Sequence, residues 1–279
     1  MTVTEFTAIV GGGALLAGFL GSLTGLGGGV VIVPLLTIGL GVDIRYAIGA
    51  SLVSVIATSS GAAAAYVREG YSNIRAGMFL EVATSAGALS GAFVATLLAP
   101  KVIAVIFGGV LVYSAYLSFK KAGEDPADTG PPDRIAAWLG LDGSYPGRSG
   151  LISYRVHNVP GGFLLMGVAG VLSGLLGIGS GALKVIAMDR FMRLPFKVST
   201  TTSNFMIGVT AAASAGVYLG RGYVDPGIAM PVMLGVLAGA FLGAHILAAA
   251  RSHWLRLAFS LVIFALGIQM IYNGLTGRI

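Results

Sequence analysis

The chain has 279 residues, of which 56% are hydrophobic and 10% are charged, and its mean hydropathy is +0.88. Soluble domains carry roughly 25% charged residues, so this composition excludes an ordinary water-soluble domain. The chain has no cysteine, which excludes disulfides, thiol catalysis and zinc–thiolate sites. Its net charge of +6 does not indicate a nucleic-acid partner, because membrane proteins gather Lys and Arg in their cytoplasmic loops.

Eight apolar stretches approach the ~20 residues that cross a bilayer, and each is predicted to form a helix. In chain order they are Phe6–Leu23, Ala47–Val67, Ala76–Ala99, Val102–Phe119, Val159–Leu176, Val198–Leu219, Pro226–Ala250 and Leu255–Ile271. An outer-membrane barrel would need alternating strands of ~10 residues, a pattern that the sequence lacks. The sequence therefore predicts an all-α, polytopic membrane protein. Because the first residues, MTVTEF, lack a basic segment, we expect no cleaved signal peptide.

The first half of the chain matches the second half at a constant offset of 152 residues. The offset pairs Gly25, Gly27 and Gly29 with Gly177, Gly179 and Gly181, and it also pairs Arg45 with Lys197, Ser51 with Ser203, Thr58 with Thr210, Tyr66 with Tyr218 and Tyr71 with Tyr223. Shared membrane composition explains scattered glycine matches but not a constant register that includes tyrosine pairs. We predict two transmembrane repeats, residues 1–119 and 159–279, of about five helical segments each, joined by a polar linker at 120–158.

The positive charges predict how the repeats are oriented in the membrane. If each glycine-broken helix pair returns to its starting side, one face holds twelve Lys and Arg residues and the other holds four; with one net crossing per pair, the count is nine against seven. The first arrangement obeys the positive-inside rule, so we predict inverted repeats in the inner (plasma) membrane, with both termini outside and the linker cytoplasmic. The twelve are Arg68, Arg75, Lys120, Lys121, Arg134, Arg148, Arg155, Arg190, Arg193, Lys197, Arg251 and Arg256; the four are Arg45, Lys101, Arg221 and Arg278.

Glycine-rich stretches precede two short apolar segments, Val30–Leu40 and Ala182–Met188, the second of which is expected to end before Asp189 and Arg190. The first would form about 16 Å of helix, against a hydrocarbon core of ~30 Å. We therefore expect helix breaks near the midplane, as in secondary transporters, where helix starts favour anions. Close helix packing is the alternative role for these glycines. The candidate binding residues are Gly27, Gly28 and Gly29 in the first break and Gly179, Ser180 and Gly181 in the second.

Hydroxyl side chains follow each of these segments. Ser51, Ser54 and Thr58 are three and four residues apart, so they share one helical face. The second half offers a similar group, and hydrogen bonding between helices is the alternative to oxyanion coordination for all of them. The candidates for binding an anion are Ser51, Ser54, Thr200, Ser203 and Asn204, with Thr210 further along.

Lys184 interrupts the second short segment, where the first half has Ile32. An isolated lysine in the membrane costs ~2.5 kcal/mol or more, so it needs a partner or a function. Lys184 lies one turn after Ser180 on the same face, and we predict that it binds the anionic substrate. The alternatives are a pair with Asp189 or Glu81, or extension of the ammonium to the interface.

Glu81 is the candidate for a proton-linked group, because intramembrane carboxylates are functional suspects. A pair with Arg75 or Arg68 at the interface is the alternative. The three histidines, at positions 157, 245 and 253, show no metal-ligand spacing, and no carboxylate pairs occur in the membrane segments. We therefore expect no metal, no cofactor and no enzymatic activity.

The segments GFLGSLTGLGGGVVIVPLL and AIGASLVSVIATSSGAAAAY, with GVLSGLLGIGSGALKV and STTTSNFMIG in the second half, resemble the sulfite exporter (TauE/SafE) family. The resemblance covers both halves and implies transport of sulfite, organosulfonates or related small anions, coupled to protons or another ion. The second half departs from the first pattern at Ser180, Lys184 and Ile186, the last standing where Pro34 predicts proline. We predict a secondary transporter that acts as an exporter; the alternatives are a passive anion channel, a permease for another small organic anion, and a membrane-embedded enzyme.

Overall fold

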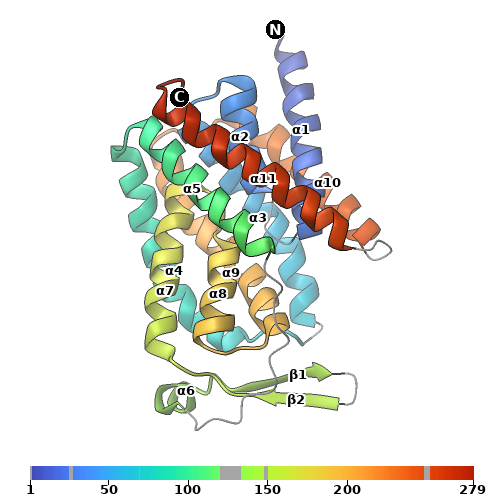
Figure 1. Ribbon diagram of the computed structural model, residues 1–279, viewed down its shortest axis with the longest axis vertical. Helices are drawn as coiled ribbons and strands as arrows, with labels where there is room; N and C mark the ends of the chain where they lie inside the picture. The colour runs from blue at the N-terminus through green and yellow to red at the C-terminus, as the bar shows by residue number, and fades with distance from the viewer. Residues whose placement is uncertain (1, 25–27, 69, 120–132, 148–149, 248–251) are drawn as a thin grey trace.

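The computed structural model describes the whole chain except residues 1, 25–27, 69, 120–132, 148–149 and 248–251. The described residues are nearly all helical (Figure 1). The helices of the first half are α1 (Val3–Thr24), α2 (Gly29–Pro34), α3 (Ile44–Arg68), α4 (Ile74–Leu97) and α5 (Pro100–Phe119). Those of the second half are α7 (Val159–Leu176), α8 (Gly181–Ile186), α9 (Phe196–Gly220), α10 (Pro226–Leu247) and α11 (Ser252–Leu275).

Each of the eight predicted apolar stretches coincides with a long helix, and Val159–Leu176 is α7 to the residue. The prediction for the second short segment is wrong at its end. A π-helical turn, η2 (Ala187–Phe191), continues α8 through Asp189 and Arg190, as η1 (Leu35–Gly39) continues α2. The charges do not end the helix, because Arg190 is exposed and keeps its guanidinium outside the bundle.

The linker corrects the all-α prediction. It contains the short helix α6 (Arg134–Leu139) and an antiparallel hairpin of β1 (Gly143–Gly147) and β2 (Gly150–Tyr154). Asn73, which caps the start of α4, donates from its side-chain amide to the Tyr154 hydroxyl at 2.9 Å and to the Leu141 carbonyl at 2.7 Å. These bonds fix the linker against one end of the helical bundle.

The two chain termini lie at one end of the bundle and the linker lies at the opposite end (Figure 1). Helix α1 packs on α10, α4 packs on α7, and α3 packs on α9. Glycines bring the backbones of the first two pairs into contact. A Cβ atom at Gly239 would lie 1.9 Å from the Leu15 carbonyl oxygen, and one at Gly87 would lie 2.2 Å from the Gly167 carbonyl oxygen.

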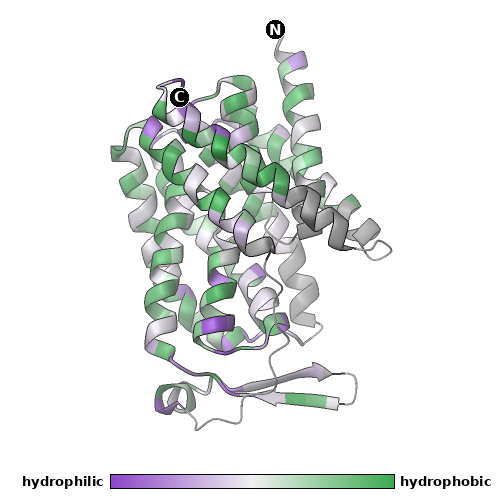
Figure 2. Ribbon diagram, in the orientation of Figure 1, coloured by the Kyte–Doolittle hydropathy of each residue, from purple (hydrophilic) through white to green (hydrophobic). Residues whose placement is uncertain are grey.

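Large apolar side chains are exposed along the outer faces of the helices, among them Leu16, Val82, Leu164 and Phe241. Figure 2 shows hydrophobic residues along the helices and hydrophilic residues toward the ends of the bundle. By length and composition α4 and α7 are each able to cross a membrane, and six further described helical segments are apolar but shorter. An exterior of this kind suits contact with lipid chains.

The helix bounds of the two halves differ by a constant 152 residues at most positions. Helix α2 with η1 covers 29–39, and α8 with η2 covers 181–191; α3 covers 44–68, and α9 covers 196–220. The ends of α1 and α7, at Thr24 and Leu176, keep the same offset.

Candidate functional site

Helix α7 stops at Leu176 and helix α8 starts at Gly181, and the four residues between them are not helical. Gly177, Gly179 and Ser180 have φ angles of 68°, 71° and 48°. Glycine adopts this left-handed region without steric penalty, whereas a residue with a Cβ atom is strained there. The serine therefore holds a conformation that its own backbone does not favour, at the point where α8 begins.

The start of α2 lies directly against this break. A Cβ atom at Gly29 would lie 3.2 Å from the Gly177 carbonyl oxygen and 2.6 Å from the Ser51 hydroxyl. The Ser51 hydroxyl itself donates to the Gly177 carbonyl oxygen at 2.8 Å. The carbonyl of Gly28, the N-cap of α2, accepts the first backbone bonds of that helix. Gly27, also predicted for the site, lies outside the described residues.

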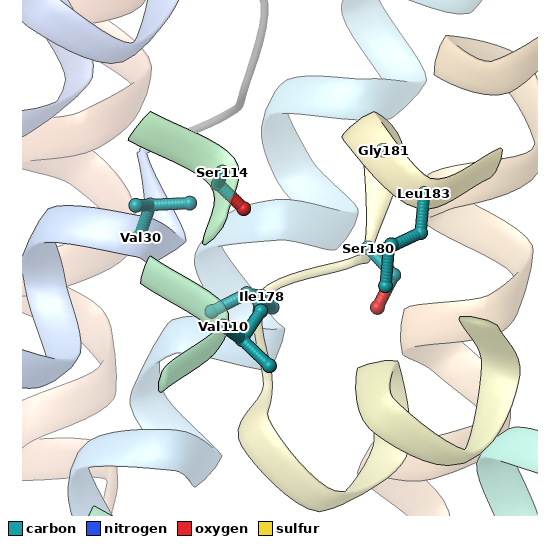
Figure 3. Close-up of a pocket in the computed structure, with 7 residues that line it drawn as sticks. All are labelled: Val30, Val110, Ser114, Ile178, Ser180, Gly181 and Leu183. Atoms are coloured by element: carbon teal, nitrogen blue, oxygen red, sulfur yellow. The ribbon is translucent and has the colours of Figure 1, made fainter. Parts of the chain in front are cut away.

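A small pocket opens beside the break, with room for about one water molecule. Figure 3 shows its lining: Val30 from α2, Val110 and Ser114 from α5, and Ile178, Ser180, Gly181 and Leu183 from the break and α8. Ser180 is 4% exposed, and its hydroxyl has no hydrogen-bond partner among the described residues. An unsatisfied buried polar group costs about 1–3 kcal/mol, so this hydroxyl is suited to binding a ligand.

The hydroxyls of α9 and α3 divide into two groups. Ser203 is buried and donates to the Gly181 carbonyl oxygen at 3.2 Å, so it lies at the break, as Ser51 does. Ser54 bonds the Ser51 carbonyl of its own helix, and Thr200 bonds the Phe196 carbonyl near the start of α9. Asn204 is half-buried on α9. The structure thus brings Ser51 and Ser203 to the break but turns Ser54 and Thr200 toward their own backbones.

Lys184 is completely buried and does not line the pocket. Its ammonium donates to the hydroxyl of Thr210 on α9. That hydroxyl lies 2.7 Å from Oε1 of Glu81 on α4, and the Ser85 hydroxyl donates to the same oxygen at 2.8 Å. Lys184 is therefore joined to Glu81 through Thr210.

Of the two expected interface partners of Glu81, Arg75 lies elsewhere in the described structure. A Cβ atom at Gly140 in the linker would lie 3.0 Å from the guanidinium of Arg75, which places Arg75 beside the linker. The side chain of Arg68 is not described. Glu81 is 7% exposed and so lies inside the bundle rather than at its rim.

Two further residues belong to the site: Ser114, which no sequence pattern indicates, and Thr210, for which the sequence indicates only a minor role. Ser114 lines the pocket from α5, and its sequence gave no signal, because the offset pairs it with Leu266. For Thr210 the sequence indicates only its repeat partner, Thr58, and a position further along the α9 hydroxyls. Among the residues that the structure describes, no group of three His, Asp or Glu side chains is placed to hold a metal ion.

A helical bundle with an apolar exterior, a broken helix and buried ionisable side chains at the break has the features of a polytopic membrane transporter. The model of the sulfite exporter TauE/SafE family matches residues 10–270, and the chain belongs to that family.

Curated relatives extend over nearly the whole chain. Probable membrane transporter protein YunE of Bacillus subtilis (strain 168) is 29% identical over 268 residues, covering 94% of this chain and 96% of that protein. Probable membrane transporter protein YdhB of the same strain is 26% identical and covers 82% of this chain and 85% of its own length. A probable membrane transporter protein of Xylella fastidiosa (strain 9a5c) is 25% identical, with 98% and 97% covered. No solved structure matches the chain.

Proposed function

We propose that the protein is a secondary transporter that exports small sulfur-containing anions such as sulfite or organosulfonates. The observation that carries the proposal is the buried, unpartnered hydroxyl of Ser180 in the pocket at the α7–α8 break. A hydroxyl donates to an oxyanion, and the ammonium of Lys184, one helical turn further on, supplies a positive charge in a poorly solvated setting. Membership of the sulfite exporter family supports this class of substrate.

The proposed architecture is a pair of inverted repeats, 1–119 and 159–279, around a cytoplasmic linker at 120–158. Three observations support it: the constant offset between helix bounds, the position of both termini opposite the linker in Figure 1, and the contact between Gly29 and Gly177 where the two broken helices meet. We place the protein in the inner membrane with its termini outside, because that orientation puts twelve positive residues on the cytoplasmic face. The breaks then lie near the midplane.

Within this architecture we assign anion binding to Ser180, Lys184, Ser203 and the backbone of Gly179 and Gly181. Val30, Val110 and Ser114 line the pocket from α2 and α5. The other members of the predicted set are Gly27, Gly28, Gly29, Ser51, Ser54, Thr200 and Asn204. The pocket is small and is lined from three parts of the chain, which favours a carrier over an open anion channel.

The test uses the purified protein and its Lys184→Met variant, with Ile32→Met as the matched control at the same position of the other half. Binding of ³⁵S-labelled sulfite is measured directly, and accumulation is measured in proteoliposomes with an imposed ion gradient. We expect Lys184→Met to bind sulfite at least about tenfold more weakly, a loss of roughly 1.4 kcal/mol, and Ile32→Met to bind as the wild type does.

A second variant covers the case in which Lys184→Met does not fold. Ser180→Gly removes the hydroxyl and suits the left-handed backbone, so it is expected to fold while binding sulfite more weakly. Wild-type affinity in both variants, or no sulfite binding by the wild type, would refute the proposal. Saturable accumulation against a sulfite gradient separates the carrier from a passive channel.

A further inference from the structure

Three buried polar side chains from different helices form a chain of contacts that begins one helical turn after Ser180. They are Lys184 on α8, Thr210 on α9 and Glu81 on α4. We propose that these residues form a proton-coupling relay, in which one proton on Glu81 accompanies each monovalent anion bound beside Lys184. The inference rests on the proposed anion transport and adds the coupling ion and the residues that carry it.

Burial requires the two ionisable groups to balance each other. Lys184 is 0% exposed and Glu81 is 7% exposed, so either charge alone would lie uncompensated inside the bundle. Glu81 is the carboxylate joined to Lys184, through the hydroxyl of Thr210. Without a bound anion, the site is therefore neutral when Lys184 is protonated and Glu81 is ionised.

The two oxygens of Glu81 have different surroundings. Oε1 accepts hydrogen bonds from Thr210 at 2.7 Å and from Ser85 at 2.8 Å. Oε2 is buried and has no hydrogen-bond partner among the described residues. A buried carboxylate oxygen without a donor is unfavourable, and a proton on Oε2 removes that penalty. Oε2 is thus the atom at which the transported proton is held.

Thr210 can adopt two hydrogen-bonding states. Its hydroxyl accepts from the Lys184 ammonium and has one proton of its own to donate. Two acceptors lie within reach, Oε1 of Glu81 at 2.7 Å and the Met206 carbonyl oxygen at 2.9 Å. The hydroxyl donates to Glu81 when that carboxylate is ionised, and it can turn to the backbone carbonyl when Glu81 is protonated. Thr210 therefore transmits the state of one ionisable group to the other.

The stoichiometry follows from charge balance. When a monovalent anion binds beside Lys184, it takes over the role of the ionised carboxylate, and Glu81 binds a proton so that the site stays neutral. When the anion leaves, the proton leaves Glu81 on the same side of the membrane. Anion and proton move together, so the step carries no net charge, and the anion is exported when its outward gradient exceeds the inward proton gradient.

The helices packed on α4 are α3, α7 and α9, and none of their described contacts brings a second cation to Glu81. Helix α7 contains no ionisable residue, and on α9 Lys197 contacts the Tyr71 ring while Tyr218 bonds the Gly174 carbonyl. On α3, Arg45 bonds the Leu98 carbonyl, and the side chain of Arg68 is not described. Among the described contacts, the relay is thus linked to a single cation.

The other half of the chain provides a matched control. The constant offset pairs Lys184, Thr210 and Glu81 with Ile32, Thr58 and Met233. The Thr58 hydroxyl bonds the carbonyls of Ser54 and Val55 in its own helix. Thr58→Val therefore removes an equivalent hydroxyl that contacts no charged group.

The experiment compares two activities of full-length protein in proteoliposomes, with the leak of protein-free liposomes subtracted. The first is exchange of external ³⁵S-sulfite for internal unlabelled sulfite; the second is net uptake driven by a pH gradient, acid outside. Glu81→Gln mimics the protonated carboxyl, so we expect it to keep exchange and to lose pH-driven uptake by at least about tenfold. Thr210→Val is expected to lose pH-driven uptake to a similar extent, whereas Thr210→Ser and Thr58→Val keep it.

The outcomes separate this inference from the proposed function. Absence of sulfite exchange in the wild type would refute anion transport itself. Wild-type exchange with net uptake that ignores the pH gradient, or that follows an imposed potassium diffusion potential instead, would overturn the relay. Equal losses of exchange and uptake in Thr210→Val would assign Thr210 a structural role and also overturn it. Loss of pH-driven uptake alone, rescued by Thr210→Ser, supports the relay.

Discussion

The two halves of the chain share one helical plan but differ in chemistry at corresponding positions. Helices α8 and α9 begin 152 residues after α2 and α3, and the contact of α1 with α10 has a counterpart in the contact of α7 with α4. Yet the offset pairs the apolar Ile32 with the charged Lys184, and the apolar Met233 with the charged Glu81. The helical scaffold is thus repeated, whereas the buried charges of Lys184 and Glu81 have apolar counterparts at the paired positions.

The difference extends to the backbone at the breaks. Gly28 has a φ angle of −65°, in the ordinary helical region, whereas its counterpart Ser180 has a φ angle of 48°. Gly28, which would tolerate a left-handed backbone, has an ordinary helical one. Ser180, whose buried hydroxyl has no described partner, has the strained left-handed one. Because strain of this kind persists where function requires it, we propose that the second break is the specialised one.

Other paired positions remain chemically similar. Arg45 lies over the Tyr223 ring at 5.6 Å, and Lys197 lies over the Tyr71 ring at 5.0 Å. Both pairs join the start of one long helix to the loop after another, and the offset of 152 relates them. Cation–π contacts are thus retained in both halves where they fasten helix starts, while the charges at the breaks are not. The two halves therefore keep the same packing contacts at these helix starts, while their side chains at the breaks differ.

The largest effect is expected from a test of whether the halves cross the membrane in opposite directions. Thr2→Cys, Gly277→Cys and Ser144→Cys each add one thiol to a chain without cysteine, at positions that are exposed in the structure. A membrane-impermeant maleimide added to intact cells is expected to label the first two and not the third. Permeabilised cells, in which Ser144→Cys should also react, provide the control. The reverse labelling pattern would break the inverted arrangement.

The next effect concerns the glycines that let the paired helices touch. Gly87→Leu and Gly239→Leu each place a side chain against a backbone carbonyl oxygen of the facing helix. We expect both to lose at least about 3 kcal/mol of stability, because a close backbone contact has no room to adjust. The measurement is the yield of monodisperse protein and its unfolding temperature. Gly109→Leu and Gly216→Leu are the controls, since no atom lies within 4 Å of a Cβ there. Loss of stability in only one of the two variants, Gly87→Leu or Gly239→Leu, would contradict the shared scaffold.

Much of the fold was predictable because hydrophobic length and glycine position are local properties of the sequence. The apolar stretches gave the long helices, and the glycines at 177 and 179 marked the end of α7. The hairpin of β1 and β2 was not predicted, because Pro146 lies within β1 and proline usually argues against a strand. The hairpin also contacts residues that are distant in sequence, such as Asn73, whose amide donates to the Tyr154 hydroxyl.

The site was predictable in part for the same reason. Ser180 is the N-cap of α8 and its carbonyl oxygen accepts from the backbone amide of Lys184, so this backbone contact follows from the start of the helix alone. That Thr210 stands between Lys184 and Glu81 depends on which face of α9 meets α4 and α8, and helical periodicity does not determine that. Ser114 enters the pocket only because α5 crosses the break. Local sequence patterns do not determine the contacts between helices that are far apart in the chain.

The smallest effect concerns how the first long helix of each half is started. Helix α1 begins with reciprocal bonds between Thr2 and Glu5, a local capping arrangement. The start of helix α7 instead contacts Asp133 in the linker, whose carboxylate accepts from the backbone amide of Val159 at 3.2 Å and also, at the start of α6, from that of Ile135 at 2.9 Å. Burial raises the pKa of Asp133, but hydrogen bonds from backbone amides and the charge of His157 together lower it by more. The net result is a pKa below the ordinary value of 3.8.

A lowered pKa in the folded protein means that the ionised carboxylate stabilises the fold. This contribution is fully present above the ordinary pKa of 3.8 and is lost as the pH falls through the lowered value. Asp133→Asn keeps only one good acceptor and no charge, so we expect it to be less stable than the wild type by about 0.5–1 kcal/mol at neutral pH. Unfolding temperatures measured across the acid range should converge below the folded pKa, where the wild type is also neutral. Glu5→Gln, which affects the start of α1 alone, serves as the comparison. An Asp133→Asn difference that persists or grows in acid would show that the linker does not hold the start of α7 through this charge.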